Sequence, residues 1–166
     1  MPVLYAILGL LVLFLLVIIF RAAAFRPAKE KMPQGETVEI DSSAAADHLA
    51  QMIRIPTVSN RDAKKSDPKQ FAAFRALLPV LYPKLHAQCA RELVGPSGLL
   101  YLWKGKNSAN PTVLMAHYDV VPVNAEDWTK PPFDAEVDEN GVMWGRGTLD
   151  TKSTLCSILE AAEALI

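Results

Sequence analysis

The amino-acid sequence predicts an α/β fold preceded by one transmembrane helix. Helical and strand-like patterns alternate along residues 41–166, and this alternation is typical of helices packed on a largely parallel or mixed sheet. Residues 112–121 are almost continuously apolar, as expected of a strand that is covered on both faces. Residues 3–20 are apolar and uncharged, which sets this segment apart from the rest of the chain.

Length and composition allow one modest domain with a hydrophobic core, since the chain has 166 residues. The net charge is −1, so the composition gives no basic face for nucleic acid, and we expect no nucleic-acid partner. Cys89 and Cys156 are the two cysteines, and their spacing indicates neither a metal-binding C-x-x-C pair nor a disulfide framework.

Residues 1–25 are assigned to a transmembrane anchor or an uncleaved signal. As a helix, the apolar run would extend about 27 Å, which is close to the hydrocarbon thickness of a bilayer. A cleaved signal peptide is the alternative, because Ala22 to Ala24 resemble a small-residue cleavage site. The anchor would make a single-pass membrane protein, whereas a cleaved signal would make a secreted one. The basic residues after the run favour a cytoplasmic C-terminal domain: Arg21, Arg26, Lys29 and Lys31.

Three helices are predicted after a linker over residues 26–40, which contains prolines and a glycine among charged residues. Asp41 should begin the first helix, whose apolar spacing covers residues 44–55, and Pro56 should end it. The second helix runs from about Pro68 towards Gln88, with Pro79 and Pro83 expected to kink or break it. The third covers residues 151–166, and its inward-facing residues should be Leu155, Ile158, Leu159, Ala162 and Leu165.

Strands are predicted over residues 93–94, 98–103 and 112–121 from their apolar content and the turn residues between them. Residues 135–144 predict a hairpin around Asn140-Gly141, a strong signal for a two-residue turn.

His117 and Asp119 stand two positions apart where the apolar run of residues 112–121 ends. Residues i and i+2 of a strand project to one face, so these side chains should lie side by side. Zinc accepts imidazole nitrogen and carboxylate oxygen, and a carboxylate next to a metal-binding imidazole fixes its tautomer. The alternatives are a core histidine without a metal and an aspartate that serves as a strand-end turn residue.

Asp150 follows a glycine-rich turn and precedes the last predicted helix. Gly145 and Gly147 indicate an unusual backbone path in this turn. A helix N-cap is the alternative role for Asp150, because aspartate is a preferred residue there.

These stretches resemble the aminoacylase/carboxypeptidase family of co-catalytic zinc hydrolases. That family includes glutamate carboxypeptidase, acetylornithine deacetylase, succinyl-diaminopimelate desuccinylase and carboxypeptidase S, and the form of the motifs is most similar to carboxypeptidase S and related N-acyl amino acid hydrolases. The resemblance covers residues 44–166 and rests on Ile55-Pro-Thr-Val-Ser59, Leu114-Met-Ala-His117-Tyr-Asp119-Val-Val-Pro122, Trp128, Pro132-Phe133, Gly141, Trp144-Gly-Arg-Gly147 and Asp150-x-Lys152.

The resemblance implies a role for each matching residue. His117 would bind one Zn²⁺ and Asp150 would bridge two. Asp119, the catalytic aspartate of the family, would orient His117. A cis peptide would follow Asp150, Lys152 would anchor the turn, and Arg146 would be structural. Thr151 departs from the aspartate or methionine that relatives often carry at this position.

The resemblance also implies the reaction, which is cleavage of an amide or peptide bond in N-acyl amino acids or small peptides through a metal-bridging water. The glutamate that transfers the proton and the remaining zinc ligands would lie beyond residue 166, as would a smaller domain that forms a homodimer. Residues 41–166 are therefore expected to be a truncated N-terminal portion of the catalytic domain, inactive alone. Glu160 and Glu163 are expected to be solvated charges.

Two other functions are weighed against this one. A non-catalytic, membrane-anchored module could reuse the same fold, although the presence of His117, Asp119 and Asp150 argues against it. A single-metal hydrolase or a phosphate site at the glycine-rich turn is the other, but Asp150 would repel an anion there.

Overall fold

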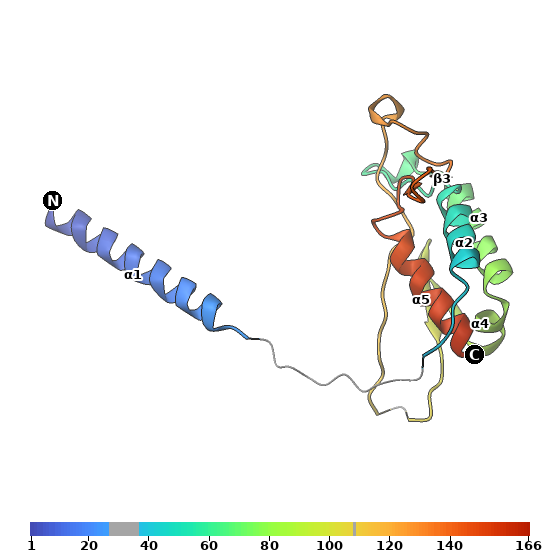
Figure 1. Cartoon of the computed structure of the whole chain (residues 1–166), viewed down its shortest axis with the longest axis horizontal. Helices are drawn as coiled ribbons and strands as arrows, with labels where there is room; N and C mark the ends of the chain where they lie inside the picture. Colours follow the sequence, from blue (N-terminus) through green and yellow to red (C-terminus); the bar gives the residue numbers. More distant parts are fainter. Residues whose placement is uncertain (27–36, 108) are drawn as a thin grey trace. The chain divides into compact units, whose positions relative to one another are not determined.

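The computed structural model describes residues 1–26, 37–107 and 109–166. The chain divides into two compact units, Met1–Glu36 and Thr37–Ile166. Helix α1 (Pro2–Ala24) belongs to the first unit, and the remaining helices and strands belong to the second (Figure 1). Most of the predicted linker, residues 27–36, lies outside the described residues.

Helix α1 confirms the predicted apolar helix. It contains 23 residues, so it is about 35 Å long at the rise of an α-helix. Its side chains are exposed along the whole length. Among the described residues, α1 is the one helix that is long and apolar enough to cross a membrane, and a signal sequence near an N-terminus has the same properties.

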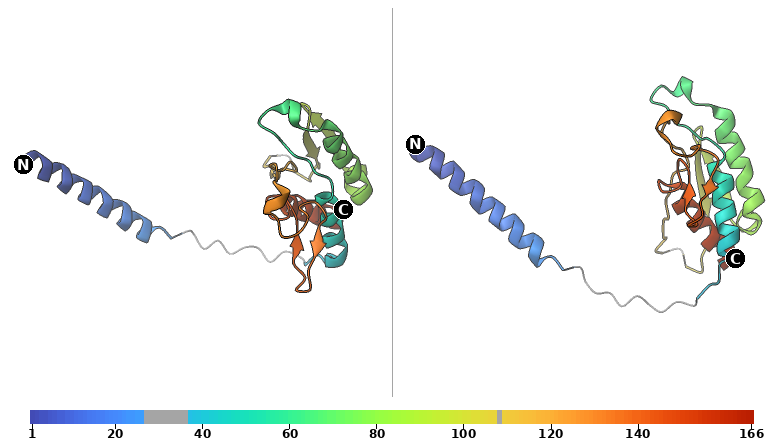
Figure 2. Two further views of the ribbon diagram at one scale, coloured as in Figure 1. Left: turned by 90° about the horizontal axis from the view of Figure 1, so that it is seen from above. Right: turned by 45° about the horizontal axis from the view of Figure 1, so that its top comes forward.

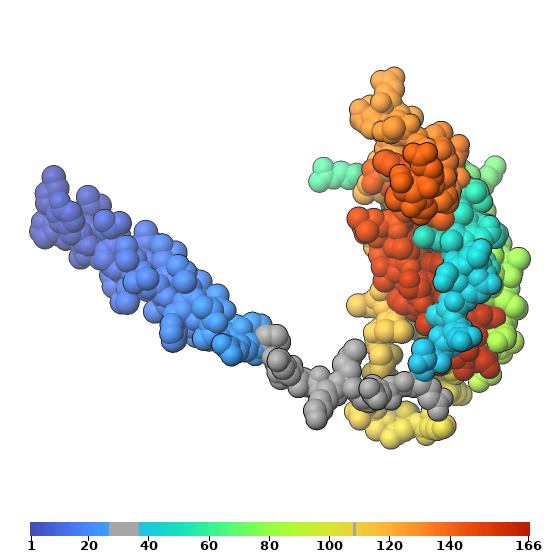
Figure 3. Space-filling model, viewed as in Figure 1, coloured from blue at the N-terminus to red at the C-terminus, as the bar shows by residue number. Residues whose placement is uncertain are grey.

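Four helices form the body of the second unit. Asp41 begins α2 (Ser42–Ile53), where its carboxylate accepts hydrogen bonds from the backbone amides of the first turn, at 2.9 and 3.1 Å. Helices α3 (Pro68–Leu81) and α4 (Pro83–Gln88) follow, and α5 (Lys152–Leu165) lies against α2 (Figures 1 and 3). Short 3-10 turns occupy Ala63–Lys65 and Ala125–Asp127.

The predicted break between α3 and α4 is confirmed at one of its two prolines. Pro83 is the first residue of α4, a position where the missing backbone N–H costs nothing. Pro79 lies inside α3 and does not end it.

The strands form two separate antiparallel hairpins. In the first, β1 (Ala90–Val94) pairs with β2 (Gly98–Leu102). In the second, β3 (Glu136–Val137) pairs with β4 (Met143–Trp144), and Figure 2 shows this hairpin as a narrow projection. Its turn contains Gly141 with a φ of 78°, a conformation that suits glycine and confirms the predicted turn.

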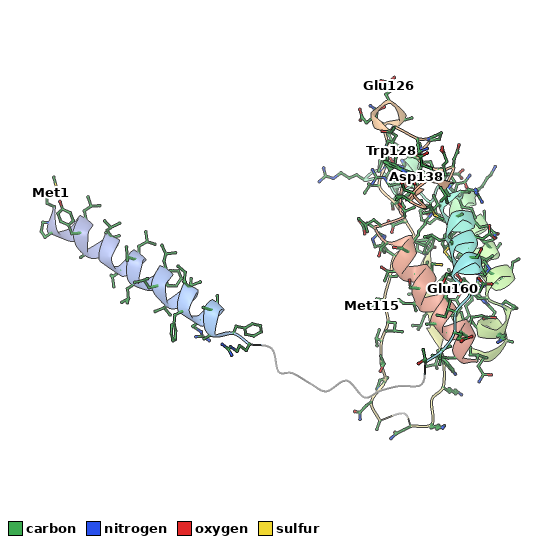
Figure 4. The ribbon with its side chains drawn as sticks, viewed as in Figure 1. Met1, Met115, Glu126, Trp128, Asp138 and Glu160 are labelled. Carbon is green, nitrogen blue, oxygen red and sulfur yellow. The ribbon has the colours of Figure 1, made fainter. Side chains whose placement is uncertain are left out.

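The predicted strand over residues 112–121 is corrected to an extended segment. Val120 alone forms a bridge, parallel to Val58. The side chains of residues 111–115 are exposed, Met115 by 82% (Figure 4). A strand needs neighbouring strands for its backbone groups, and in the described part of the chain only residues 57–59 pair with it. The large mixed sheet therefore stays a prediction.

The core of the second unit lies between α2, α3, α4 and α5. Tyr82 and Phe74 are the largest fully buried side chains. Leu155, Leu159 and Ala162 of α5 contact this core as predicted. Ile158 is half-buried outside this cluster, and Leu165 is 60% exposed. The buried members are Met52, Phe74, Leu78, Leu81, Tyr82, Leu85, Cys89, Cys156 and Leu159, and neither cysteine forms a disulfide.

Glu160 and Glu163 are not the solvated charges that the sequence predicted. The Glu160 side chain is 12% exposed and accepts hydrogen bonds from the Tyr82 hydroxyl at 2.8 Å and from His48 Nδ1 at 2.6 Å (Figure 4). The Glu163 carboxylate accepts the backbone amides of Lys84 at 2.9 Å and of Leu85 at 2.7 Å. Both glutamates thus tie α5 to the other helices.

Replacing Glu163 with alanine should destabilise the second unit. The change removes the carboxylate that caps the N-terminus of α4, and loss of such a cap costs about 1 kcal/mol. Urea unfolding of the full chain, followed by tryptophan fluorescence, measures the effect, since all three tryptophans lie in this unit. Glu139→Ala, at an exposed position of the β3–β4 turn, is the control. Equal unfolding midpoints for the two variants would contradict the capping role.

Candidate metal centre

Tyr118 fixes the extended segment that carries His117 and Asp119. Its ring stacks on Phe74, with ring centroids 4.8 Å apart and planes 10° apart. Because side chains alternate along an extended chain, the residues before and after Tyr118 point away from the core. The side chain of His117 is 52% exposed and that of Asp119 is 42% exposed. The prediction that these two side chains lie side by side is confirmed by their contact.

The two ring nitrogens of His117 have different partners. Nδ1 lies 2.9 Å from the backbone carbonyl oxygen of Asp119 and 3.2 Å from its carboxylate. Nε2 lies 3.0 Å from Asp150 Oδ1. Desolvation lowers the pKa of His117, but these acceptors outweigh it and raise the pKa above its ordinary value. With Nδ1 held by Asp119, Nε2 is the nitrogen that faces Asp150.

Asp150 lies at the end of a turn that two glycines allow. A Cβ on Gly145 would lie 2.6 Å from Ile53 Cγ2, and one on Gly147, whose φ is 95°, would lie 2.8 Å from Val120 Cγ1. The unusual backbone path predicted from these glycines is confirmed at Gly147, whereas at Gly145 the structure shows a close approach to α2. The turn passes close to both the end of α2 and the segment that carries Asp119.

The carboxylate of Asp150 is not used as a helix cap. Thr151 occupies the N-cap position of α5, and no side chain caps this helix end. The Asp150 side chain is 85% exposed and its contact is with His117. The peptide bond between Asp150 and Thr151 is cis, as the resemblance implied.

Lys152 anchors the turn, as predicted. Its side chain is completely buried, and Nζ donates to the carbonyl oxygens of Met52 and Ile55, both at 2.8 Å. Its backbone N–H donates to Gly147 at 3.0 Å. Burial lowers the pKa of Lys152 to about 7, with a smaller opposing effect from Asp119.

The contacts of Arg146 connect two loops and do not involve the three candidate site residues. Its backbone N–H donates to the carbonyl oxygen of Pro132 at 2.6 Å, and its guanidinium lies 5.0 Å from the ring centroid of Trp128. These contacts attach the loop over residues 124–134 to the glycine-rich turn.

The donor atoms that meet at this site suit a divalent metal ion such as zinc, which accepts imidazole nitrogen and carboxylate oxygen. Two donors of one tetrahedral zinc ion lie about 3.3 Å apart when each bond is about 2.0–2.1 Å. The 3.0 Å between His117 Nε2 and Asp150 Oδ1 is close to that separation, and it equally suits a hydrogen bond. The described residues contain no group of three or more such side chains placed to hold a metal, and the contact of His117 with Asp150 brings together two.

The sequence did not predict how the end of α2 contacts this site. Residues 55–59 were expected to end the helix and formed part of the family resemblance, without a predicted contact to the site. In the structure Thr57 is completely buried, and its hydroxyl donates to the carbonyl oxygen of Tyr118. A buried hydroxyl is almost always hydrogen-bonded, so knowledge that Thr57 is buried would have predicted this bond. The sequence alone did not show that Thr57 is buried.

Comparison with known proteins identifies the family. Residues 113–166, which contain His117, Asp119 and Asp150, match the model of peptidase family M20/M25/M40. The chain belongs to this family. Its two site stretches and the cis peptide lie within the matching region.

Three curated relatives support the assignment. Carboxypeptidase S of Saccharomyces cerevisiae is 37% identical over 134 residues, which are 75% of this chain and 23% of the yeast protein. The human N-fatty-acyl-amino acid synthase/hydrolase PM20D1 is 34% identical over 126 residues, or 74% of this chain and 25% of the human protein. The probable carboxypeptidase S-like 2 of Dictyostelium discoideum is 32% identical over 168 residues, or 95% of this chain and 32% of that protein. The chain thus spans about a quarter to a third of the length of these relatives.

Proposed function

We propose that this chain is the N-terminal portion of a membrane-anchored, zinc-dependent hydrolase. The substrate would be an N-acyl amino acid or a small peptide, and the bond cleaved would be an amide or peptide bond. Residues 41–166 would supply part of the catalytic domain and its mixed sheet. The observation that carries the proposal is the meeting of His117 Nε2 with the Asp150 carboxylate at 3.0 Å, within the segment that matches the peptidase family.

The side chains have separate roles in this proposal. His117 presents Nε2 as a metal ligand, and Asp150 presents an exposed carboxylate that is able to bridge two ions. Asp119 accepts a hydrogen bond from the Nδ1–H of His117, which leaves Nε2 free to bind a metal and makes it a better ligand. A bound metal ion supplies Lewis acidity to the scissile carbonyl and lowers the pKa of an attacking water.

Proton transfer requires a further group, because neither His117 nor Asp150 is free to act as a base while it binds metal. The two glutamates of α5 are occupied elsewhere. Glu160 accepts from Tyr82 and His48, and Glu163 caps α4. As the family resemblance implies, we expect the catalytic glutamate and the remaining ligands of two zinc ions outside residues 1–166, and we expect this chain alone to be inactive. A homodimer formed through a further domain is part of the same proposal.

Asp150→Ala should abolish hydrolysis in an active protein that contains this chain. Metal assistance contributes several kcal/mol to catalysis, so kcat/KM should fall about 1000-fold or more. The measurement is hydrolysis of a panel of N-acyl amino acids and dipeptides, with circular dichroism to show that the fold is retained. Asp127→Ala, at an exposed position, is the matched control.

Retained activity in Asp150→Ala would contradict the bridging role. A chelator should also remove activity from the wild-type protein, and added zinc should restore it. A folded protein that binds no zinc and cleaves nothing on the panel would instead support the non-catalytic module.

We also propose that α1 is an uncleaved, single-pass anchor. The helix is about 35 Å long, exposes apolar side chains on every face and therefore has no polar side for water. The anchor would hold the hydrolase at a membrane surface.

The anchor predicts that the mature protein keeps residues 1–24 and stays in the membrane pellet after extraction with alkaline carbonate. Mass measurement of the N-terminal peptide and the distribution between pellet and supernatant test both points. A mature protein that starts just after Ala24 and is released into the medium would show that the segment is a cleaved signal.

A further inference from the structure

The segment Met52–Ser59, which joins the end of α2 to the loop that follows, contacts both stretches of the candidate metal centre. On one side it meets the extended segment with His117 and Asp119, and on the other the turn with Asp150. We refer to residues 52–59 as the brace.

The first set of contacts holds the backbone on either side of Asp119. The Thr57 hydroxyl donates to the carbonyl oxygen of Tyr118. The backbone N–H of Val120 donates to the Thr57 carbonyl oxygen at 2.9 Å, and the Ser59 N–H donates to the Val120 carbonyl oxygen at 2.8 Å. Since Thr57 is completely buried, water does not compete for its hydroxyl. The brace therefore fixes the position of the backbone next to His117.

The second set of contacts holds the turn that carries Asp150. Lys152 Nζ donates to the Met52 and Ile55 carbonyl oxygens, which lie at the C-terminal end of α2, where a positive charge is favourable. Gly145 packs against Ile53 so closely that no Cβ would fit between them. Asp150 thus lies in a turn that is attached to the brace on both sides.

The two donor side chains are exposed, and apart from the contact of His117 Nδ1 with Asp119 and the stacking of the neighbouring Tyr118 on Phe74, it is the brace that holds their backbones. His117 is 52% exposed and Asp150 is 85% exposed, so packing does not restrict their carboxylate and imidazole groups. Their separation depends on where their backbones are placed, and both backbones are attached to the same eight-residue segment, residues 52–59.

We propose that Thr57 and Lys152 are positioning residues that set the separation of His117 and Asp150 for metal binding. Neither residue contacts the donor atoms, and each acts through the brace. The inference rests on the proposed function, because it assigns these contacts a purpose at the proposed metal site. A purely stabilising role would change the stability of the fold without a specific loss of zinc affinity.

The test compares Thr57→Val, which keeps the shape and removes the hydroxyl, with Thr57→Ser, which keeps the hydroxyl. Zinc is titrated into the full chain, and NMR follows the ring signals of His117, with His48 and His86 as internal references. Thr57→Val should weaken zinc binding at His117 about 10-fold. Losses of about this size follow when a residue that orients a metal ligand without touching the metal is replaced. Thr57→Ser should keep the zinc affinity of the wild-type chain, and Lys152→Met should lower the zinc affinity as Thr57→Val does.

Thr154→Val makes the same chemical change at an exposed position of α5 and should leave zinc binding unchanged. Urea unfolding of each variant separates a loss of stability from a loss of affinity. If folded Thr57→Val binds zinc at His117 as tightly as the wild-type chain, the inference is wrong.

A second readout separates this inference from the proposed function. NMR contacts between the His117 ring and the Asp150 side chain should be present in the wild-type chain without metal and should be lost in Thr57→Val. Zinc should bind the wild-type chain only weakly, because the remaining ligands are expected outside residues 1–166. His117 signals that respond to high zinc no more than those of His48 and His86 would contradict the metal-binding role of His117 on which the proposed function depends. Loss of the ring contacts in Thr57→Val would then still support positioning by Thr57, whereas their persistence would refute it.

Discussion

The buried ammonium group of Lys152 joins the two parts of the chain on which the site depends. Its two hydrogen bonds reach the carbonyl oxygens of Met52 and Ile55, about one hundred residues earlier. A buried charge is costly unless it is well bonded, and burial lowers the pKa of this lysine to about 7. The helix end supplies two oriented carbonyl groups and a favourable dipole. Phe74 lies 5.0 Å from the ammonium group and adds a cation–π contact from the core. The position of α5, and with it that of Asp150, is therefore tied to α2.

The candidate metal centre lies at the surface of a well-packed core and depends on it. Tyr118 is the link, because its ring is stacked on Phe74 while its backbone carbonyl accepts from Thr57. The neighbouring residues His117 and Asp119 point outward as a consequence. On the other side, Gly147 approaches Val120 too closely for any side chain. A larger residue there would separate the turn from the extended segment and would move Asp150 away from His117.

Local sequence signals predicted the helices well and the long-range contacts poorly. Asp41 and Pro83 mark helix ends through hydrogen bonding and backbone geometry that act over a few residues. The pairing of His117 with Asp119 follows from the alternation of an extended chain. The roles of Glu160 and Glu163 were mispredicted because their partners lie 112 and 79 residues away, where no periodicity reports on them. Residues 112–121 have the composition of a buried strand, but composition does not supply a neighbouring strand. The contact of Asp150 with His117 was expected from the family resemblance and not from spacing alone.

The central claim is that His117 and Asp150 are held together so that both bind one metal ion. The most direct measurement is anomalous X-ray diffraction at the zinc edge from crystals of a zinc-loaded protein that contains this chain. We expect an anomalous peak about 2.0–2.2 Å from both His117 Nε2 and an Asp150 carboxylate oxygen. His117 Nδ1 should keep its hydrogen bond to Asp119. A zinc peak bound by other residues, with His117 and Asp150 bonded only to each other, would contradict the account.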